Sequence, residues 1–159
     1  MSNVHHATWS IERVYPVPPA TVFPAWADID VKRQWFLGAD GRPDESLTDD
    51  FRVGGVETMS GITPGGDRFT YQSTYRDIVQ DERIVTTYDM TINEDRISVS
   101  VVTVELSAHG EGTTLVYTEQ GAYLDGLDEP ESRQGGVATH LDTLGEVLDG
   151  VKDLRGDRG

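Results

Sequence analysis

Glu119 is the first candidate for chemistry, because it is a carboxylate in a segment with a strand-like apolar pattern. It follows Tyr117 by two residues, so both side chains point to the same face of a sheet. A carboxylate on an apolar face either has a raised pKa or pairs with an arginine. Arg13, Arg96 and Arg133 are the candidate partners. Glu119 would then either orient a ligand or act as an acid or base, or it would form a structural ion pair.

His140 is the second titratable candidate, and it lies between Val137 and Leu144 at steps of three and four residues. This spacing puts it at the margin of an apolar helical face, where an imidazole titrates near neutral pH. Two interpretations stay open at this stage. His140 either contacts a ligand cavity or is packed or solvated without a function.

A set of large apolar and aromatic side chains could form the wall of a binding pocket, because such pockets are mostly apolar with a few polar groups. The same residues could equally be ordinary core. Strand alternation groups Tyr88 with Met90 on one face but does not say which face is inside. The candidates are Trp35, Phe36, Tyr71, Tyr88, Met90 and Tyr117.

Several kinds of chemistry are excluded by what the sequence lacks. The chain has no cysteine, which excludes thiol catalysis, disulfides and cysteine-ligated metals. It has no glycine-rich phosphate loop, no Gly-x-Ser-x-Gly elbow and no His-Glu-x-x-His motif. His5 and His6 are adjacent, but no third metal ligand is evident. We therefore expect no metal site and no cofactor.

Composition narrows the class of partner. The 159 residues fit one domain, and 13 Lys and Arg against 28 Asp and Glu give a net charge of −15. Such a charge repels phosphate backbones and anionic lipid, so we expect no nucleic-acid or membrane partner. No apolar run approaches the roughly 18 residues of a membrane helix, and no secretory signal is evident. We expect a cytoplasmic protein.

The elements that must position these residues are mostly strands, with helical segments near each end. Residues 9–15 read as a strand, and 20–27 as a helix that Pro24 should bend. A second short helix, capped by Asp28 or Asp30, should end at Trp35. We expect a loop over 38–50 and an acidic loop over 124–132. The further predicted strands cover 51–59, 68–79, 83–92, 96–108 and 113–123.

The last element is the clearest helix in the sequence. Its apolar residues recur at steps of four and three, which gives one apolar face. A meander of strands has an apolar face of its own, so the simplest arrangement lays this helix across the sheet in an α+β fold. If the sheet curves, a pocket remains between the two. The apolar residues of the helix are Val137, Leu141, Leu144, Leu148 and Val151.

The order of elements resembles the helix-grip fold of the START-like (SRPBCC) superfamily. The motifs are similar to the family named for homologues of the heat-shock protein 90 ATPase activator. They cover most of residues 8–150 and comprise Pro18-Pro19, Val22-Phe23, Ala25-Trp26, Trp35-Phe36, Phe51-Arg52-Val53-Gly54-Gly55, Tyr75-Arg76-Asp77-Ile78-Val79, Glu82-Arg83-Ile84-Val85, and Thr118 to Gly126 with Arg133 and Gly135-Gly136. The chain departs from the family pattern at Pro24, Ile29 and Val137.

This resemblance implies a curved antiparallel sheet wrapped around a long C-terminal helix, with two short helices after the first strand. It also implies a small-molecule cavity but no chaperone partner. We expect a single domain over residues 8–154 between a flexible N-terminus (1–7) and a flexible tail (155–159). An exposed edge strand would allow a homodimer.

The leading functional hypothesis is a non-catalytic module that binds a small hydrophobic ligand. A cyclase, dehydratase or hydrolase that uses the same cavity is the second hypothesis, with Glu119 and His140 as acid and base. A stress-related regulator of a chaperone ATPase is the third, and it depends on the family name alone.

Overall fold

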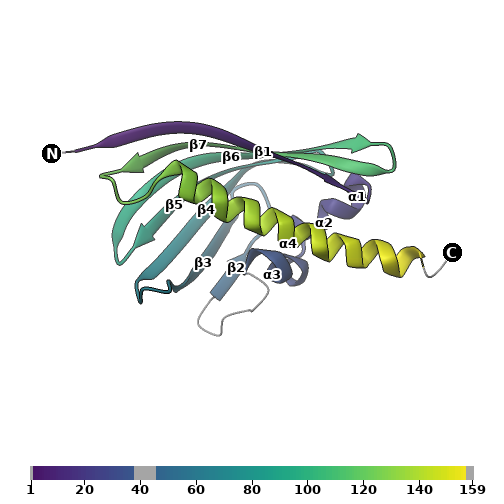
Figure 1. The fold of residues 1–159 in the computed structure, drawn as a ribbon, viewed down its shortest axis with the longest axis horizontal. Helices are drawn as coiled ribbons and strands as arrows, with labels where there is room; N and C mark the ends of the chain where they lie inside the picture. Colours follow the sequence, from purple (N-terminus) through teal and green to yellow (C-terminus); the bar gives the residue numbers. More distant parts are fainter. Residues whose placement is uncertain (1, 38–45, 157–159) are drawn as a thin grey trace.

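The computed structural model describes residues 2–37 and 46–156. They form one antiparallel sheet of seven strands in the order β1-β7-β6-β5-β4-β3-β2, with a long helix lying across it (Figure 1). The strands are β1 (Val4–Tyr15), β2 (Ser46–Asp49), β3 (Val56–Ile62), β4 (Arg68–Val79), β5 (Arg83–Ile92), β6 (Asp95–His109) and β7 (Gly112–Leu124). The helices are α1 (Pro19–Val22), α2 (Pro24–Ala27), α3 (Ile29–Phe36) and α4 (Pro130–Gly156).

The segment after β1 folds into three short helices rather than the two that we predict. Pro24 begins α2, so the predicted bent helix over 20–27 becomes two separate turns. A proline lacks the N–H that would continue the hydrogen-bond pattern of α1. The Asp28 carboxylate accepts a hydrogen bond from the backbone N–H of Asp30 at 2.9 Å and so caps α3.

The strands differ from the predicted ones mainly at their ends. β1 begins at Val4, so part of the predicted flexible N-terminus is paired with β7. β2 lies inside the predicted loop over 38–50, of which 38–45 are outside the described residues. β3 starts only at Val56, because Gly54 has a φ of +84° in a tight turn that interrupts the predicted strand over 51–59.

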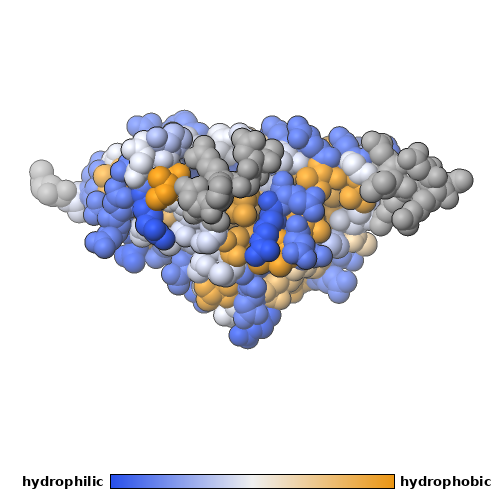
Figure 2. Space-filling view, turned by 90° about the horizontal axis from the view of Figure 1, so that it is seen from below, coloured by the Kyte–Doolittle hydropathy of each residue, from blue (hydrophilic) through white to orange (hydrophobic). Residues whose placement is uncertain are grey.

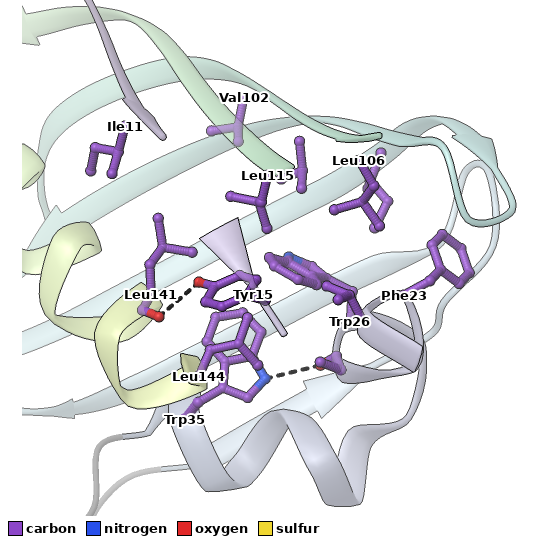
Figure 3. Packing of buried hydrophobic residues seen from close by; sticks show 14 of the residues in the cluster. Ile11, Tyr15, Phe23, Trp26, Trp35, Val102, Leu106, Leu115, Leu141 and Leu144 are labelled. Atoms are coloured by element: carbon purple, nitrogen blue, oxygen red, sulfur yellow. Dashed lines mark hydrogen bonds between the residues drawn. The ribbon is translucent and has the colours of Figure 1, made fainter. Parts of the chain in front are cut away.

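The core lies between the concave face of the sheet and one side of α4. Leu141, Leu144 and Leu148 from the predicted apolar face are all buried. The Tyr15 hydroxyl donates to the carbonyl of Leu141 at 2.8 Å and joins β1 to α4 (Figure 3). Trp26 packs against Trp35 in the same cluster, with ring centroids 4.8 Å apart.

The long helix begins at Pro130, earlier than the predicted start of its apolar face. The predicted acidic loop over 124–132 is therefore shorter, and Arg133 stands in the first turn of α4. The helix continues to Gly156, so the predicted tail over 155–159 starts within it, and 157–159 lie outside the described residues. This early start brings the arginine over the sheet.

The surface carries both hydrophilic and apolar side chains (Figure 2). On the face shown in Figure 2, apolar patches are separated by hydrophilic side chains. Within residues 2–37 and 46–156, we find no helix with the combined length and apolarity that a membrane crossing requires.

Candidate functional site

A cavity of about 260 Å³ lies between the first half of α4 and strands β4, β5 and β7. Pockets for drug-sized ligands usually measure about 300–1,000 Å³, so this one fits a smaller molecule. Its lining is mainly aromatic and aliphatic, with an arginine and an aspartate on one side. The lining residues are Phe36, Tyr71, Tyr88, Met90, Tyr117, Asp128, Ser132, Arg133, Gly136, Val137 and His140. We call this the outer cavity.

A second space of about 60 Å³, the inner cavity, lies deeper in the core and shares part of its wall with the outer one. The shared wall residues are Phe36, Tyr71, Tyr117, Val137 and His140. The Phe36 ring lies 5.6 Å from Tyr71 and 5.5 Å from His140, measured between centroids. These packed rings form the partition between the two cavities.

Most of the residues that the sequence singled out are brought together here. Six line the outer cavity: Phe36, Tyr71, Tyr88, Met90, Tyr117 and His140. Trp35 instead lines the inner cavity, and its indole N–H donates to the carbonyl of Ala25 at 3.0 Å. Glu119 is fully buried and lies behind the wall, outside the lining of both cavities.

Glu119 is held by hydroxyl groups. Its Oε2 accepts hydrogen bonds from Tyr88 at 2.8 Å, Ser100 at 3.0 Å and Tyr123 at 3.3 Å. Its Oε1 accepts one from Tyr117 at 3.3 Å. Burial raises the pKa of Glu119, although these hydrogen bonds and a nearby arginine oppose the rise. The carboxylate therefore organises the tyrosines behind the cavity wall.

Arg133 is the arginine that pairs with Glu119, at 3.7 Å from guanidinium nitrogen to Oε2. The other two candidates pair elsewhere: Arg13 with Asp142 and Arg96 with Asp89.

The guanidinium of Arg133 makes three hydrogen bonds, which fix its position at one end of the outer cavity. It donates to the Tyr88 hydroxyl at 2.6 Å, to Ser98 at 2.9 Å and to Asp128 at 2.6 Å. The negative charges around it and the hydrogen bond to Tyr88 raise the pKa of Arg133 against the opposing effect of burial. Arg133 is therefore a permanent cation.

His140 is half-buried and faces both cavities. Burial lowers the pKa of its imidazole below the ordinary value of 6.5. The ring is therefore neutral at pH 7 and offers a flat, weakly polar surface beside Phe36.

The sequence analysis missed a second polar cluster, which contains the buried residues Lys32, Glu57, Tyr75 and the carboxyl group of Asp49. Lys32 Nζ bonds to Glu57 and donates to the Tyr75 hydroxyl at 3.1 Å. Tyr75 in turn donates to Asp49 at 2.7 Å. Burial raises the pKa of Asp49 even though Lys32 lowers it. Lys32 and Glu57 line the inner cavity.

Metal binding finds no support in the part of the chain that the structure describes. Residues 2–37 and 46–156 contain no group of three or more His, Asp or Glu side chains placed to hold an ion. His5 and His6 are neighbours on β1, where their side chains are exposed. The charged side chains that line the two cavities are Lys32, Glu57, Asp128 and Arg133.

Comparison with known proteins decides the family. The sequence model of the family described as "Activator of Hsp90 ATPase homolog 1-like protein" matches residues 16–149. The chain belongs to this family. The match includes every residue that lines the two cavities, and it extends along α4 to residue 149. The resemblance found in the sequence is thereby confirmed, and no curated protein matches the chain.

Solved structures of bacterial proteins share the fold of this chain. An uncharacterised protein from Rhizobium leguminosarum is 38% identical, with a TM-score of 0.89 over 94% of this chain and 98% of that one. The Mll3558 protein from Rhizobium loti is 42% identical, with a TM-score of 0.84 over 91% and 98%. The CV1439 protein from Chromobacterium violaceum is 22% identical, with a TM-score of 0.70 over 89% and 96%.

These comparisons and the observed sheet and helix confirm the predicted START-like helix-grip fold. Neither of the two Rhizobium proteins is named for a ligand. What the family member does must therefore be argued from its own cavity.

Proposed function

We propose that this protein is a binding module for a small, largely apolar molecule. The ligand would occupy the outer cavity between the sheet and α4. Tyr71, Tyr88 and Tyr117 would supply aromatic contact, and Arg133 would orient one polar group of the ligand. The observation that carries the proposal is the composition of the cavity wall, in which the rings of Phe36, Tyr71, Tyr88 and Tyr117 line the same space as one fixed guanidinium.

The size of the cavity sets the expected affinity. Burial of apolar surface contributes roughly 25 cal/mol per Å², from which the cost of association must be subtracted. A molecule that fits about 260 Å³ would then bind in the micromolar range. Fixed aromatic walls favour flat molecules, because rings stack on rings and Met90 packs against them.

The arrangement supports binding more than the enzymatic alternative. An acid–base pair must reach the same reacting atoms, with hydrogen-bond distances of about 3 Å. Glu119 is committed to Tyr88, Ser100 and other hydroxyls behind the wall, whereas His140 faces the cavities. A role as regulator of a chaperone ATPase has only the family description in its support.

The test uses a pair of neighbouring glycines in α4 that differ in one respect. Gly136 lines the outer cavity, whereas Gly135 does not, and an added Cβ meets nothing within 4 Å at either position. Gly136→Leu should fill the cavity, and Gly135→Leu is the matched control. Both should gain about 1 kcal/mol of helix stability, since glycine is a poor helix former.

The three proteins are titrated calorimetrically with a panel of one- and two-ring aromatic compounds, and their melting temperatures are recorded. We expect saturable micromolar binding by the unmodified protein and by Gly135→Leu, and at least a tenfold loss in Gly136→Leu. If the unmodified protein bound nothing in the panel, or if Gly136→Leu bound as well as Gly135→Leu, the proposal would be wrong.

A further inference from the structure

We propose that the outer cavity selects neutral molecules that carry a hydrogen-bond acceptor and rejects carboxylates of the same shape. This inference rests on the proposed function and specifies the chemical class of its ligand. It follows from two facts about the cavity: its charged groups are paired within the protein, and most of its hydrogen-bond donors are bonded to other protein groups.

The first step concerns the net charge at Arg133. An arginine in an apolar cavity ordinarily attracts a carboxylate, because its planar fork matches that group. Here two carboxylates already surround it: Asp128 at 2.6 Å and Glu119 at 3.7 Å. With both ionised, the cluster has one negative charge in excess. With Glu119 protonated it is neutral, so in neither state does it offer positive charge to an incoming anion.

The second step concerns the charges of the Lys32, Glu57 and Asp49 cluster at the inner cavity. Lys32 is paired with Glu57 and lies 3.9 Å from Asp49. Whether Asp49 carries its charge or a proton, this cluster has no net positive charge either. His140, which faces both cavities, is neutral at pH 7. An anion would therefore lose its hydration without gaining an uncompensated cation, which is costly in an apolar site.

The third step concerns the donors that remain. Tyr88 and Tyr117 line the cavity, but their hydroxyls donate to Glu119 behind its wall. A guanidinium has five N–H groups. Among the described residues, Arg133 uses three of them, on Tyr88, Ser98 and Asp128. The other two N–H groups have no hydrogen-bond partner among the described residues, so we infer that the matching ligand group is a neutral acceptor such as a carbonyl or ether oxygen.

The test compares three probes that differ in one small substituent on the same ring system: 2-acetylnaphthalene, 2-naphthoate and 2-ethylnaphthalene. The first is neutral with an acceptor, the second is anionic, and the third is neutral without an acceptor. Calorimetric titration at pH 7.5 should give the tightest binding for 2-acetylnaphthalene. We expect at least tenfold weaker binding for 2-naphthoate and about threefold weaker binding for 2-ethylnaphthalene.

A variant isolates the effect of charge. Asp128→Asn keeps a side-chain oxygen for Arg133 but removes one negative charge beside the cavity. Asp125→Asn is the control, because it makes the same change of net charge at an exposed turn residue outside the cavity lining. The ratio of affinities for 2-acetylnaphthalene and 2-naphthoate should fall at least threefold in Asp128→Asn and stay constant in Asp125→Asn.

The outcomes separate this inference from the proposed function. Equal or tighter binding of 2-naphthoate, or a ratio that Asp128→Asn leaves unchanged, would overturn the charge selection while leaving the binding module intact. Equal affinity for 2-ethylnaphthalene and 2-acetylnaphthalene would overturn the role of the free N–H groups. Failure of all three probes and of the aromatic panel to bind would overturn the proposed function and this inference together.

Discussion

The guanidinium of Arg133 and the carboxylate of Glu119 lie 3.7 Å apart, and the Tyr88 hydroxyl bridges them. Tyr88 accepts a hydrogen bond from Arg133 at 2.6 Å and donates one to Glu119 at 2.8 Å. This contact joins the first turn of α4 to β7 through β5. It therefore holds the helix over the sheet at the end where the outer cavity lies.

Replacing Arg133 should be costly, because it leaves Glu119 buried without its counter-charge. We expect Arg133→Met to lower the free energy of unfolding by about 3–5 kcal/mol. The matched control is Arg96→Met, since the Arg96–Asp89 pair is exposed and such pairs contribute less than about 1 kcal/mol. Urea denaturation of the two variants and the parent protein measures both losses. Equal losses would contradict the structural role of the buried pair.

The chain provides an equally direct test of the second polar cluster around Lys32. It has only two lysines, Lys32 and Lys152. Lys32 is buried, whereas Lys152 is exposed on α4. Lys32→Met removes the cation beside Glu57 and Asp49, so it should cost about 3–5 kcal/mol. Lys152→Met should change stability by less than about 0.5 kcal/mol.

A second substitution identifies the cause of the loss at Lys32. Adding Glu57→Gln to Lys32→Met removes a buried, unpaired carboxylate and should restore at least about 1 kcal/mol in denaturant unfolding. If the double variant were less stable than Lys32→Met alone, the loss would come from packing rather than from charge.

The pH dependence of stability should show the opposite behaviour of two groups. The pKa of His140 is lowered in the folded state, so the unfolded chain binds more protons below pH 6.5. The stability that depends on the neutral imidazole of His140 is therefore fully present above pH 6.5 and is lost as the pH falls. The raised pKa of Glu119 acts in the other direction, because its protonated form is favoured in the folded state, and stability from this group is lost as pH rises above 4.5.

A variant separates these effects. His140→Phe should remove the part of the stability loss between pH 7 and pH 5 that comes from the histidine. His109→Gln, at the exposed end of β6, should follow the profile of the parent protein. The measurement is the midpoint of urea unfolding at several pH values. Parallel profiles for His140→Phe and the parent protein would show that the imidazole is not held neutral by burial.

The strand pattern and the apolar face of α4 could be predicted from sequence because they follow from regular periodicity. Leu141, Leu144 and Leu148 recur at helical spacing and are buried as expected. The alternation of side chains along a strand likewise predicts that Tyr88 and Met90 share one face of the sheet, and both line the outer cavity. Which face of the sheet is buried depends on where α4 lies. No local sequence pattern contains that information, so the buried face could not be predicted.

The polar part of the site could not be derived in the same way. Lysine is almost always exposed, so nothing local marks Lys32 as buried; its partners Glu57 and Asp49 come from strands far along the chain. Arg133 was one of three candidates for Glu119, and the early start of α4 at Pro130 decides between them. That start depends on how the helix packs on the sheet rather than on its own apolar repeat.

The most direct test of ligand binding between sheet and helix uses the methionine methyl groups. The chain has three methionines, Met1, Met59 and Met90, and of these Met90 lines the outer cavity. In protein with ¹³C-labelled methionine methyls, Met90→Leu assigns the signal. On titration with 2-acetylnaphthalene we predict that the Met90 methyl shifts to saturation and shows intermolecular NOEs to the naphthalene ring, while Met59 shows none. A Met90 methyl that stays unshifted at saturating probe, without such NOEs, would contradict the account.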